Sequence, residues 1–83
     1  MNQIKFAALS RLLTELGFAK RIDPKFIRFD NLDANAWFLY PPYGDAEDVA
    51  LTDLVGTRHI LDAKGMLSRQ QFEERLRSIP VAS

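Results

Sequence analysis

His59 is the only histidine of the chain, and it offers the simplest acid–base chemistry that the sequence contains. Asp62 follows three residues later, so on a helix its carboxylate could contact the imidazole ring. Arg58 competes for the same carboxylate, and the sequence has no second histidine to form an acid–base pair or a metal site. We therefore expect His59 to be an ordinary packed or partly exposed residue, and we predict no catalytic residue.

Four basic residues in one short stretch could contact the phosphates of RNA: Lys20, Arg21, Lys25 and Arg28. Attraction to a phosphate backbone grows with the number of cations that contact it and weakens as salt is added. Asp23 and Asp30 lie within the same stretch and offset part of this charge. The pattern therefore fits either a weak RNA-binding patch or a solvated face of the domain.

Trp37 and Tyr43 are candidate residues for binding a partner, because aromatic rings stack on bases and anchor protein interfaces. Core packing is the other role open to Trp37, and we expect it to be the main one. Tyr43 follows Pro41 and Pro42 in a predicted loop, so we expect it to be more exposed.

The sequence carries none of the motifs that hold a cofactor or a metal ion. The acidic run from Asp45 to Asp48 has residue types that calcium prefers, but it lacks the spacing and the closing glutamate of an EF-hand loop. There is no phosphate-binding glycine loop, and there is no cysteine for a disulfide or a thiolate site. We therefore expect no cofactor and no metal.

The chain of 83 residues is expected to form a single domain over residues 1–83. Its hydrophobic fraction of 47% and its charged fraction of 27% are typical of globular proteins. No apolar run is long enough to span a membrane, and no leader-like segment opens the chain. We therefore expect a cytoplasmic protein that does not bind membranes.

Charge is balanced over the whole chain but uneven along it. The 11 basic and 11 acidic residues cancel, which weighs against a strong non-specific binder of nucleic acid. Residues 1–30 hold six basic and three acidic side chains, whereas residues 31–62 hold one basic and six acidic ones. This division fits a single basic face, and it equally fits self-association of a positive face with a negative one.

The hydrophobic pattern predicts a helix, three strands and two further helices. The first helix runs from about residue 3 to residue 16 and ends at Gly17, since glycine readily adopts the positive φ of a helix C-terminus. Strands are expected at 19–22, 25–30 and 37–40. Short turns between them predict an antiparallel meander, but apolar residues on both faces leave the buried face of the sheet undecided.

A second helix is expected from residue 51 or 52 to Lys64, with Gly65 just after its end and an apolar face formed by Leu51, Leu54, Val55 and Leu61. Arg58 falls near the middle of this face, so we assign it a structural role. It would brace the helix by pairing with Asp62 or with acidic side chains of the preceding loop.

A third helix is expected to start at Ser68, which forms a capping box with Gln71, while Leu67 and Phe72 form a hydrophobic staple. Pro80 ends this helix, because the residue before a proline avoids the helical region.

In this order of elements, the chain resembles the HicA-like (YcfA-like) family of small bacterial proteins. Four segments carry the resemblance: the Leu-x-x-Leu-Gly-Phe helix end at 12–18, the basic strand–turn–strand at 20–29, the strand ending in proline at 37–42, and the helix at 54–65. The resemblance covers roughly residues 3–65, and the third helix looks like an extension.

The resemblance implies an α+β fold like that of a double-stranded-RNA-binding domain. In this fold the order α-β-β-β-α forms a three-stranded antiparallel meander with helices on one face, here with an extra C-terminal helix. In the toxins of the family, the resemblance implies RNA cleavage by the histidine of a Gly-Ser-His signature. The matching segment here reads Asp23-Pro24-Lys25, with proline in place of the serine and lysine in place of the histidine.

We therefore predict a non-catalytic HicA-like binding module that engages RNA or a protein partner, such as an antitoxin-like protein. One alternative is an mRNA-cleaving ribonuclease toxin of a toxin–antitoxin pair, which would use Lys25 or another group. The other alternative is a homodimeric protein-interaction domain that pairs through the third-strand edge or through an open sheet face.

Overall fold

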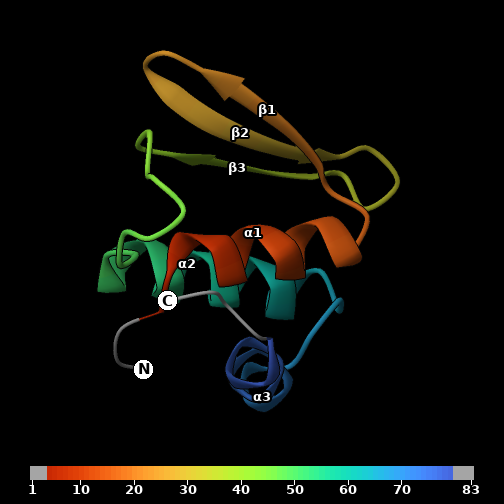
Figure 1. Ribbon diagram of the computed structural model, residues 1–83. Coiled ribbons are helices and arrows are strands. Elements are labelled where there is room, and N and C mark those ends of the chain that lie inside the picture. Colours follow the sequence, from red (N-terminus) through yellow and green to blue (C-terminus); the bar gives the residue numbers. More distant parts are fainter. Residues whose placement is uncertain (1–3, 80–83) are drawn as a thin grey trace.

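The computed structural model describes residues 4–79, and its elements follow the predicted order (Figure 1). They are α1 (Phe6–Glu15), β1 (Ala19–Asp23), β2 (Phe26–Asn31), β3 (Ala36–Tyr40), α2 (Leu51–Ala63) and α3 (Arg69–Ser78). The first helix was expected from about residue 3, which lies outside the described residues, but the expectation is wrong for residues 4 and 5, because Lys5 is extended and the helix begins at Phe6. The strand bounds differ from the predicted ones by no more than one residue at either end.

The three strands form one antiparallel sheet in the order β1-β2-β3. Phe29 on β2 lies opposite Lys20 on β1 and opposite Phe38 on β3. In the turn between β2 and β3, Asn35 adopts a positive φ of 51°, which asparagine tolerates better than most residues. The predicted α+β class with a three-stranded antiparallel meander is therefore confirmed.

The helices lie on one side of the sheet (Figure 1). Helix α1 contacts β1, α2 contacts β3, and α3 packs against α1 and α2 on the side away from the strands. Within residues 4–79, no element covers the opposite side of the sheet. We call that side the open face.

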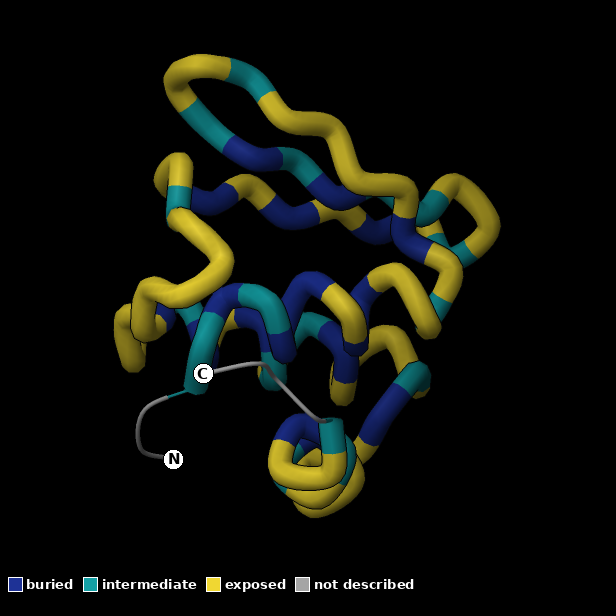
Figure 2. Tube along the Cα trace, in the orientation of Figure 1, coloured by how far each residue is buried: buried dark blue, intermediate teal, exposed yellow. Residues whose placement is uncertain are grey.

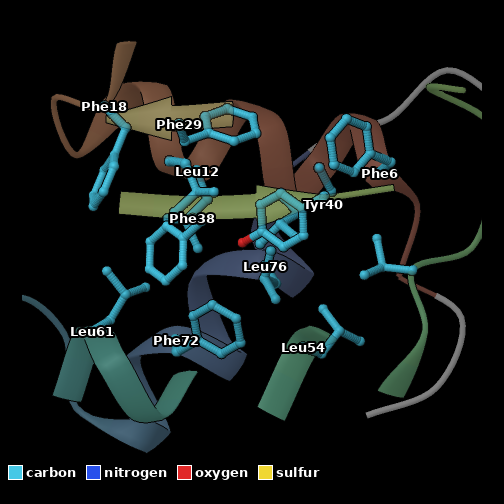
Figure 3. Close-up of a cluster of buried hydrophobic side chains, with 14 of the residues drawn as sticks. Phe6, Leu12, Phe18, Phe29, Phe38, Tyr40, Leu54, Leu61, Phe72 and Leu76 are labelled. Carbon is cyan, nitrogen blue, oxygen red and sulfur yellow. The ribbon is translucent and has the colours of Figure 1, made fainter. Parts of the chain in front are cut away.

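The hydrophobic core fills the space between the sheet and the helices (Figure 3). Alternate residues of β2 and β3 turn towards the helices and are buried: Ile27, Phe29, Ala36, Phe38 and Tyr40. Phe6 of α1 meets the Phe29 ring edge-on, with 6.2 Å between ring centroids. Figure 2 shows burial concentrated where β2, β3 and the helices face one another, while β1 is mostly exposed.

Two glycines end the first two helices as predicted. Gly17 has a φ of 96° and Gly65 a φ of 70°. After α1, the amides of Gly17 and Phe18 donate to the carbonyls of Thr14 and Leu13 at 3.1 and 3.0 Å. This paired pattern is a Schellman motif, which satisfies the last carbonyls of the helix and turns the chain towards β1.

The buried face of α2 differs from the prediction. Leu54, Thr57 and Leu61 are buried, whereas Leu51 is 61% and Val55 is 39% exposed. The helix buries Thr57 because its hydroxyl group is fully hydrogen-bonded, donating to the Asp53 carbonyl at 2.8 Å and lying 2.5 Å from the Tyr40 hydroxyl. A buried hydroxyl with both partners costs little, so the helix is rotated away from its most apolar stripe.

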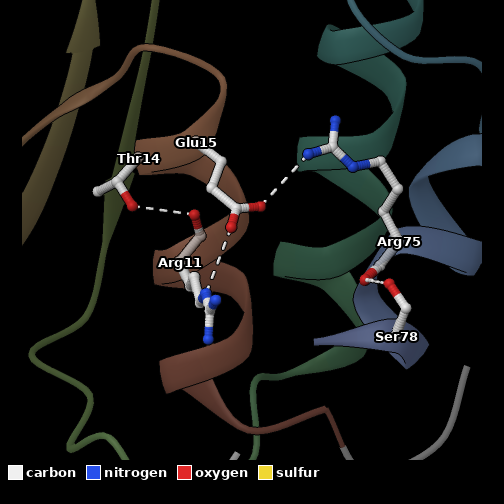
Figure 4. Close-up of polar contacts among 5 residues, drawn as sticks. All are labelled: Arg11, Thr14, Glu15, Arg75 and Ser78. Carbon is white, nitrogen blue, oxygen red and sulfur yellow. Dashed lines mark hydrogen bonds and ion pairs between the residues drawn. The ribbon is translucent and has the colours of Figure 1, made fainter. Parts of the chain in front are cut away.

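Helix α3 begins with the predicted capping box. The Ser68 hydroxyl accepts from the Gln71 amide at 3.2 Å, and the Gln71 side chain accepts from the Ser68 amide at 3.0 Å. Glu15 of α1 links the two helices by accepting from Arg11 and from Arg75, each at 3.3 Å (Figure 4). Such exposed pairs contribute little stability, so α3 is held mainly by its buried apolar side chains.

Replacing Phe72 by alanine tests whether α3 belongs to the folded unit. The Phe72 ring is fully buried, so its loss should lower the free energy of unfolding by about 3–5 kcal/mol. This is comparable to the whole stability of a small domain, and circular dichroism should report a largely unfolded protein. Gln70→Ala, on the exposed side of the same helix, is the matched control and should change stability by less than about 0.5 kcal/mol. An unfolding midpoint close to that of the unmodified chain in Phe72→Ala would contradict a shared core.

Candidate functional site

The open face carries the side chains that alternate with the core residues along each strand. The cross-strand register aligns Arg21, Arg28 and Leu39 in one row, and Ala19, Asp30 and Trp37 in the next. Both rows therefore begin at the exposed strand β1 and end in an apolar side chain on β3.

Trp37 lies on this face and is 56% exposed. The expectation that it packs in the core is wrong, because Ala36, Phe38 and Tyr40 face the helices and the alternation of the strand turns Trp37 the other way. The guanidinium carbon of Arg28 lies 5.1 Å from the centroid of the indole ring. Arg28 in turn donates to Asp30 at 2.7 Å, so an ion pair holds the arginine that stacks on Trp37.

Leu39 lies two residues further along β3 on the same face and is 51% exposed. Together Trp37 and Leu39 form an apolar strip at the edge of the sheet, which we call the Trp37–Leu39 strip. Leu39 was not among the predicted site residues, since apolar side chains occupy both faces of β3 and the sequence alone does not distinguish them. The strip is a candidate docking surface, because exposed aromatic and aliphatic side chains that adjoin each other mark interaction sites.

The four candidate RNA-binding residues do not gather on one surface. Arg21 and Arg28 lie on the open face, in register with each other. Lys20 points to the helix side, with its amine 5.3 Å from the centroid of the Phe6 ring. Lys25 lies in the exposed turn between β1 and β2, where its amide donates to the Asp23 carboxylate at 3.4 Å. The structure thus divides the predicted basic patch between two faces and a turn.

Tyr43 is not the exposed residue that its loop position predicted. Its ring packs against Phe6, with 5.2 Å between centroids, and its hydroxyl donates to the Asp53 carboxylate at 2.6 Å. The same hydroxyl accepts from the Ala50 amide at 3.0 Å. Burial and the hydrogen bond with Asp53 both raise the pKa of Tyr43. Tyr43 therefore fixes the loop before α2 to the body of the domain.

Arg58 and His59 border an open groove on α2 and the start of α3, together with Leu51, Val55, Asp62 and Arg69. None of these residues comes from the β1–β2 turn. The predicted partners of Arg58, which were Asp62 and the loop acids, are wrong. Its guanidinium group lies 3.6 Å from the carboxylate of Glu73, so Arg58 connects α2 to α3.

In comparisons with known proteins, no family model, no curated protein and no solved structure matches the chain. The resemblance to the HicA-like family therefore stays a prediction. Within residues 4–79, no helix is long and apolar enough to cross a membrane. The same residues contain no cluster of three or more metal-ligating side chains.

The ion pair of Arg58 should contribute little to stability. Its two side chains keep 18% and 30% of their surface exposed, and their 3.6 Å separation is long for a charge-assisted hydrogen bond. We therefore expect a coupling energy between the two side chains of no more than about 1 kcal/mol. A double-mutant cycle of Arg58→Ala with Glu73→Ala, followed by urea unfolding, measures this coupling apart from the packing that each substitution removes. A coupling energy of about 3 kcal/mol or more would instead indicate a fully buried pair.

Alkaline unfolding should follow the hydroxyl of Tyr40. Burial raises the pKa of Tyr40 far above its ordinary value, and the hydrogen bond with Thr57 offsets only part of this rise. A phenol with a raised pKa in the folded state stabilises the fold fully below its unfolded pKa of about 10, and this stabilisation is lost as the pH rises further. Tyrosinate absorbance should therefore show one tyrosine ionising only together with unfolding, and Tyr40→Phe should remove that step. Ionisation of both tyrosines in the folded protein near pH 10 would refute the burial of this hydroxyl.

Proposed function

We propose that this chain is a non-catalytic binding domain that engages a protein partner through the Trp37–Leu39 strip of its open face. The observation that carries the proposal is the pair of half-exposed side chains, Trp37 at 56% and Leu39 at 51%. Leaving adjoining apolar surface in water is unfavourable, and a small domain has little stability to spare. A partner that covers the strip would remove this cost.

The finer fold assignment is part of the same proposal. The order α1-β1-β2-β3-α2, with helices against one side of an antiparallel sheet, supports a fold like that of a double-stranded-RNA-binding domain. It is also compatible with a HicA-like domain to which α3 has been added. Both assignments rest on element order and on the segments that resemble the family.

Charge favours a protein over RNA as the partner. Arg21 and Arg28 are the basic residues of the open face, and Asp23 and Asp30 accompany them on the same two strands. Arg28 is already paired with Asp30 and stacked on Trp37. Affinity for RNA depends on cations that are free to displace the counterions of the phosphates. Tryptophan beside arginine is, in contrast, a frequent composition of protein-binding hot spots.

Lys25 is poorly placed to act as a catalytic base. A lysine acts as a general base only where burial or neighbouring charge disfavours its protonated form. Lys25 is exposed in a turn, and His59 borders a different groove, formed by α2 and the start of α3. The Asp23 carboxylate, at the turn that matches the toxin signature, accepts from the backbone amide of Lys25, and this bond does not activate the Lys25 amine.

The proposed function is tested by capture with purified, tagged chain in an extract of the source cells, with bound proteins and bound RNA both identified. Unmodified chain and Leu32→Lys should retain the same protein, whereas Leu39→Lys should retain at least about ten-fold less. Leu32 is the matched control because it is exposed, at 93%, but lies in the turn between β2 and β3.

Two results would contradict the proposal. Salt-sensitive capture of RNA, equal for the three chains and without a protein dependent on Leu39, would indicate an RNA-binding module. Growth arrest on expression, together with RNA cleavage that Lys25→Ala abolishes, would indicate a ribonuclease toxin.

A further inference from the structure

The outer edge of β3 is the less protected of the two edges of the sheet. Its five residues, Ala36–Tyr40, carry no charge, and in the part of the chain that the structure describes no strand pairs with this edge. The other edge strand, β1, carries Lys20, Arg21 and Asp23 and is followed by a proline. Charged residues and proline discourage edge strands from pairing with other chains. The edge of β3 lacks this protection and is suited to accept another strand.

A groove of about 530 Å³ runs along this edge, between β3 and α2. Its helical wall contains residues that are one turn apart: Thr52, Gly56, Ile60 and Lys64. Gly56 lies in the interior of α2, where glycine costs about 1 kcal/mol relative to alanine. A Cβ atom added to Gly56 would meet no atom within 4 Å apart from its two chain neighbours and the nearby backbone of its own helix. Packing within one chain therefore does not require this glycine, whereas close approach of a second molecule would.

We propose that a second copy of this chain is the partner: it pairs with β3 along the outer edge and covers the groove. This inference rests on the proposed function, because it names the partner that the Trp37–Leu39 strip binds. A two-fold axis relates the copies, so the two β3 strands run antiparallel and the two sheets become one. The same edge is used in both copies, so association ends at a dimer.

The side chains of β3 are complementary to themselves in this arrangement. Pairing centred on Phe38 sets Trp37 opposite Leu39 of the second copy on the open face. The symmetry makes this contact twice. Dimer formation thus removes the apolar surface of both Trp37 and Leu39 from contact with water. It also gives hydrogen-bond partners to the unpaired backbone groups of both β3 edges.

Charges around the edge agree with the same arrangement. On the open face, Asp30 lies next to Trp37 and Arg28 next to Leu39. Each contact between Trp37 and Leu39 is therefore flanked by an acidic residue of one copy and a basic residue of the other. In the groove, Asp53 lies near the start of α2 and Lys64 just after its end. The two-fold axis brings the basic end of one groove towards the acidic end of the other. The two α2 helices then run antiparallel, so the positive N-terminus of each lies towards the negative C-terminus of the other.

The expected dimer is weak. An edge of five residues buries less surface than a typical specific interface, which buries about 1,200–2,000 Å². We therefore expect a dissociation constant on the order of 10 µM.

The test is sedimentation velocity of the full chain from about 1 µM to about 500 µM, combined with tryptophan fluorescence over the same range. Trp37 is the single tryptophan, so its emission reports directly on the proposed contact. Mass should rise from one copy to two, and the emission should shift to the blue as dimer forms. Leu39→Lys should raise the dissociation constant at least about ten-fold, whereas Leu32→Lys should leave it unchanged.

A second pair of variants tests the groove. Gly56→Gln introduces a good helix former that would fill the space next to the edge, so it should raise the melting temperature of the monomer and weaken the dimer at least about five-fold. Ala63→Gln makes a similar change at an exposed position of α2 that does not line the groove, and it should leave association unchanged.

The outcomes separate this inference from the function on which it rests. A chain that stays monomeric up to about 500 µM overturns the dimer. If such a chain still captures a different protein through Leu39, the proposed function stands and the identity of the partner is wrong. Dimerisation that Leu39→Lys and Gly56→Gln leave unchanged also overturns the inference, because it would use another surface.

Discussion

The one-sided coverage of the sheet is the constraint from which the roles of the strand residues follow. Within residues 4–79, α1, α2 and α3 lie on one side, so each strand must place its core residues at alternate positions and leave the others in water. On β3 this alternation separates Phe38, which is buried, from Trp37, which is exposed. On β1 it turns Lys20 towards the aromatic core and Arg21 away from it. The composition of the open face is thus a consequence of how the opposite face packs.

The sequence predicted the elements well, because their ends carry strong local signals. Gly17 and Gly65 end helices where a positive φ is required, and the reciprocal bonds of Ser68 and Gln71 start α3. These signals depend on neighbouring residues only, so they can be read without the tertiary structure. The uniform pattern of short turns between apolar segments likewise predicted the meander.

The roles of individual side chains were harder to predict, because they depend on contacts between distant segments. Trp37 and Phe38 are both aromatic, and only the register with β2 and the side taken by the helices decides which one is buried. Tyr43 is less exposed than predicted, because its ring packs against Phe6 and its hydroxyl is hydrogen-bonded to Asp53. Thr57 lies on the buried face of α2, which the apolar pattern does not predict, since its hydrogen-bond partner Tyr40 lies 17 residues away in sequence. The position of Gly56 inside the second helix can be read from the sequence. Only the structure shows that there is open space beside it, which is why we assign it a role in association.

Trp37 offers the most direct measurement of the one-sided architecture, since it is the only tryptophan and its position depends on which face the helices cover. Quenching of its fluorescence by acrylamide should be measured at submicromolar concentration, where association through the β3 edge is negligible. The structure predicts strong quenching and a red-shifted emission, as expected for an indole that is 56% exposed. Weak quenching with blue-shifted emission under these conditions would mean that the open face is covered and would contradict the structure described above.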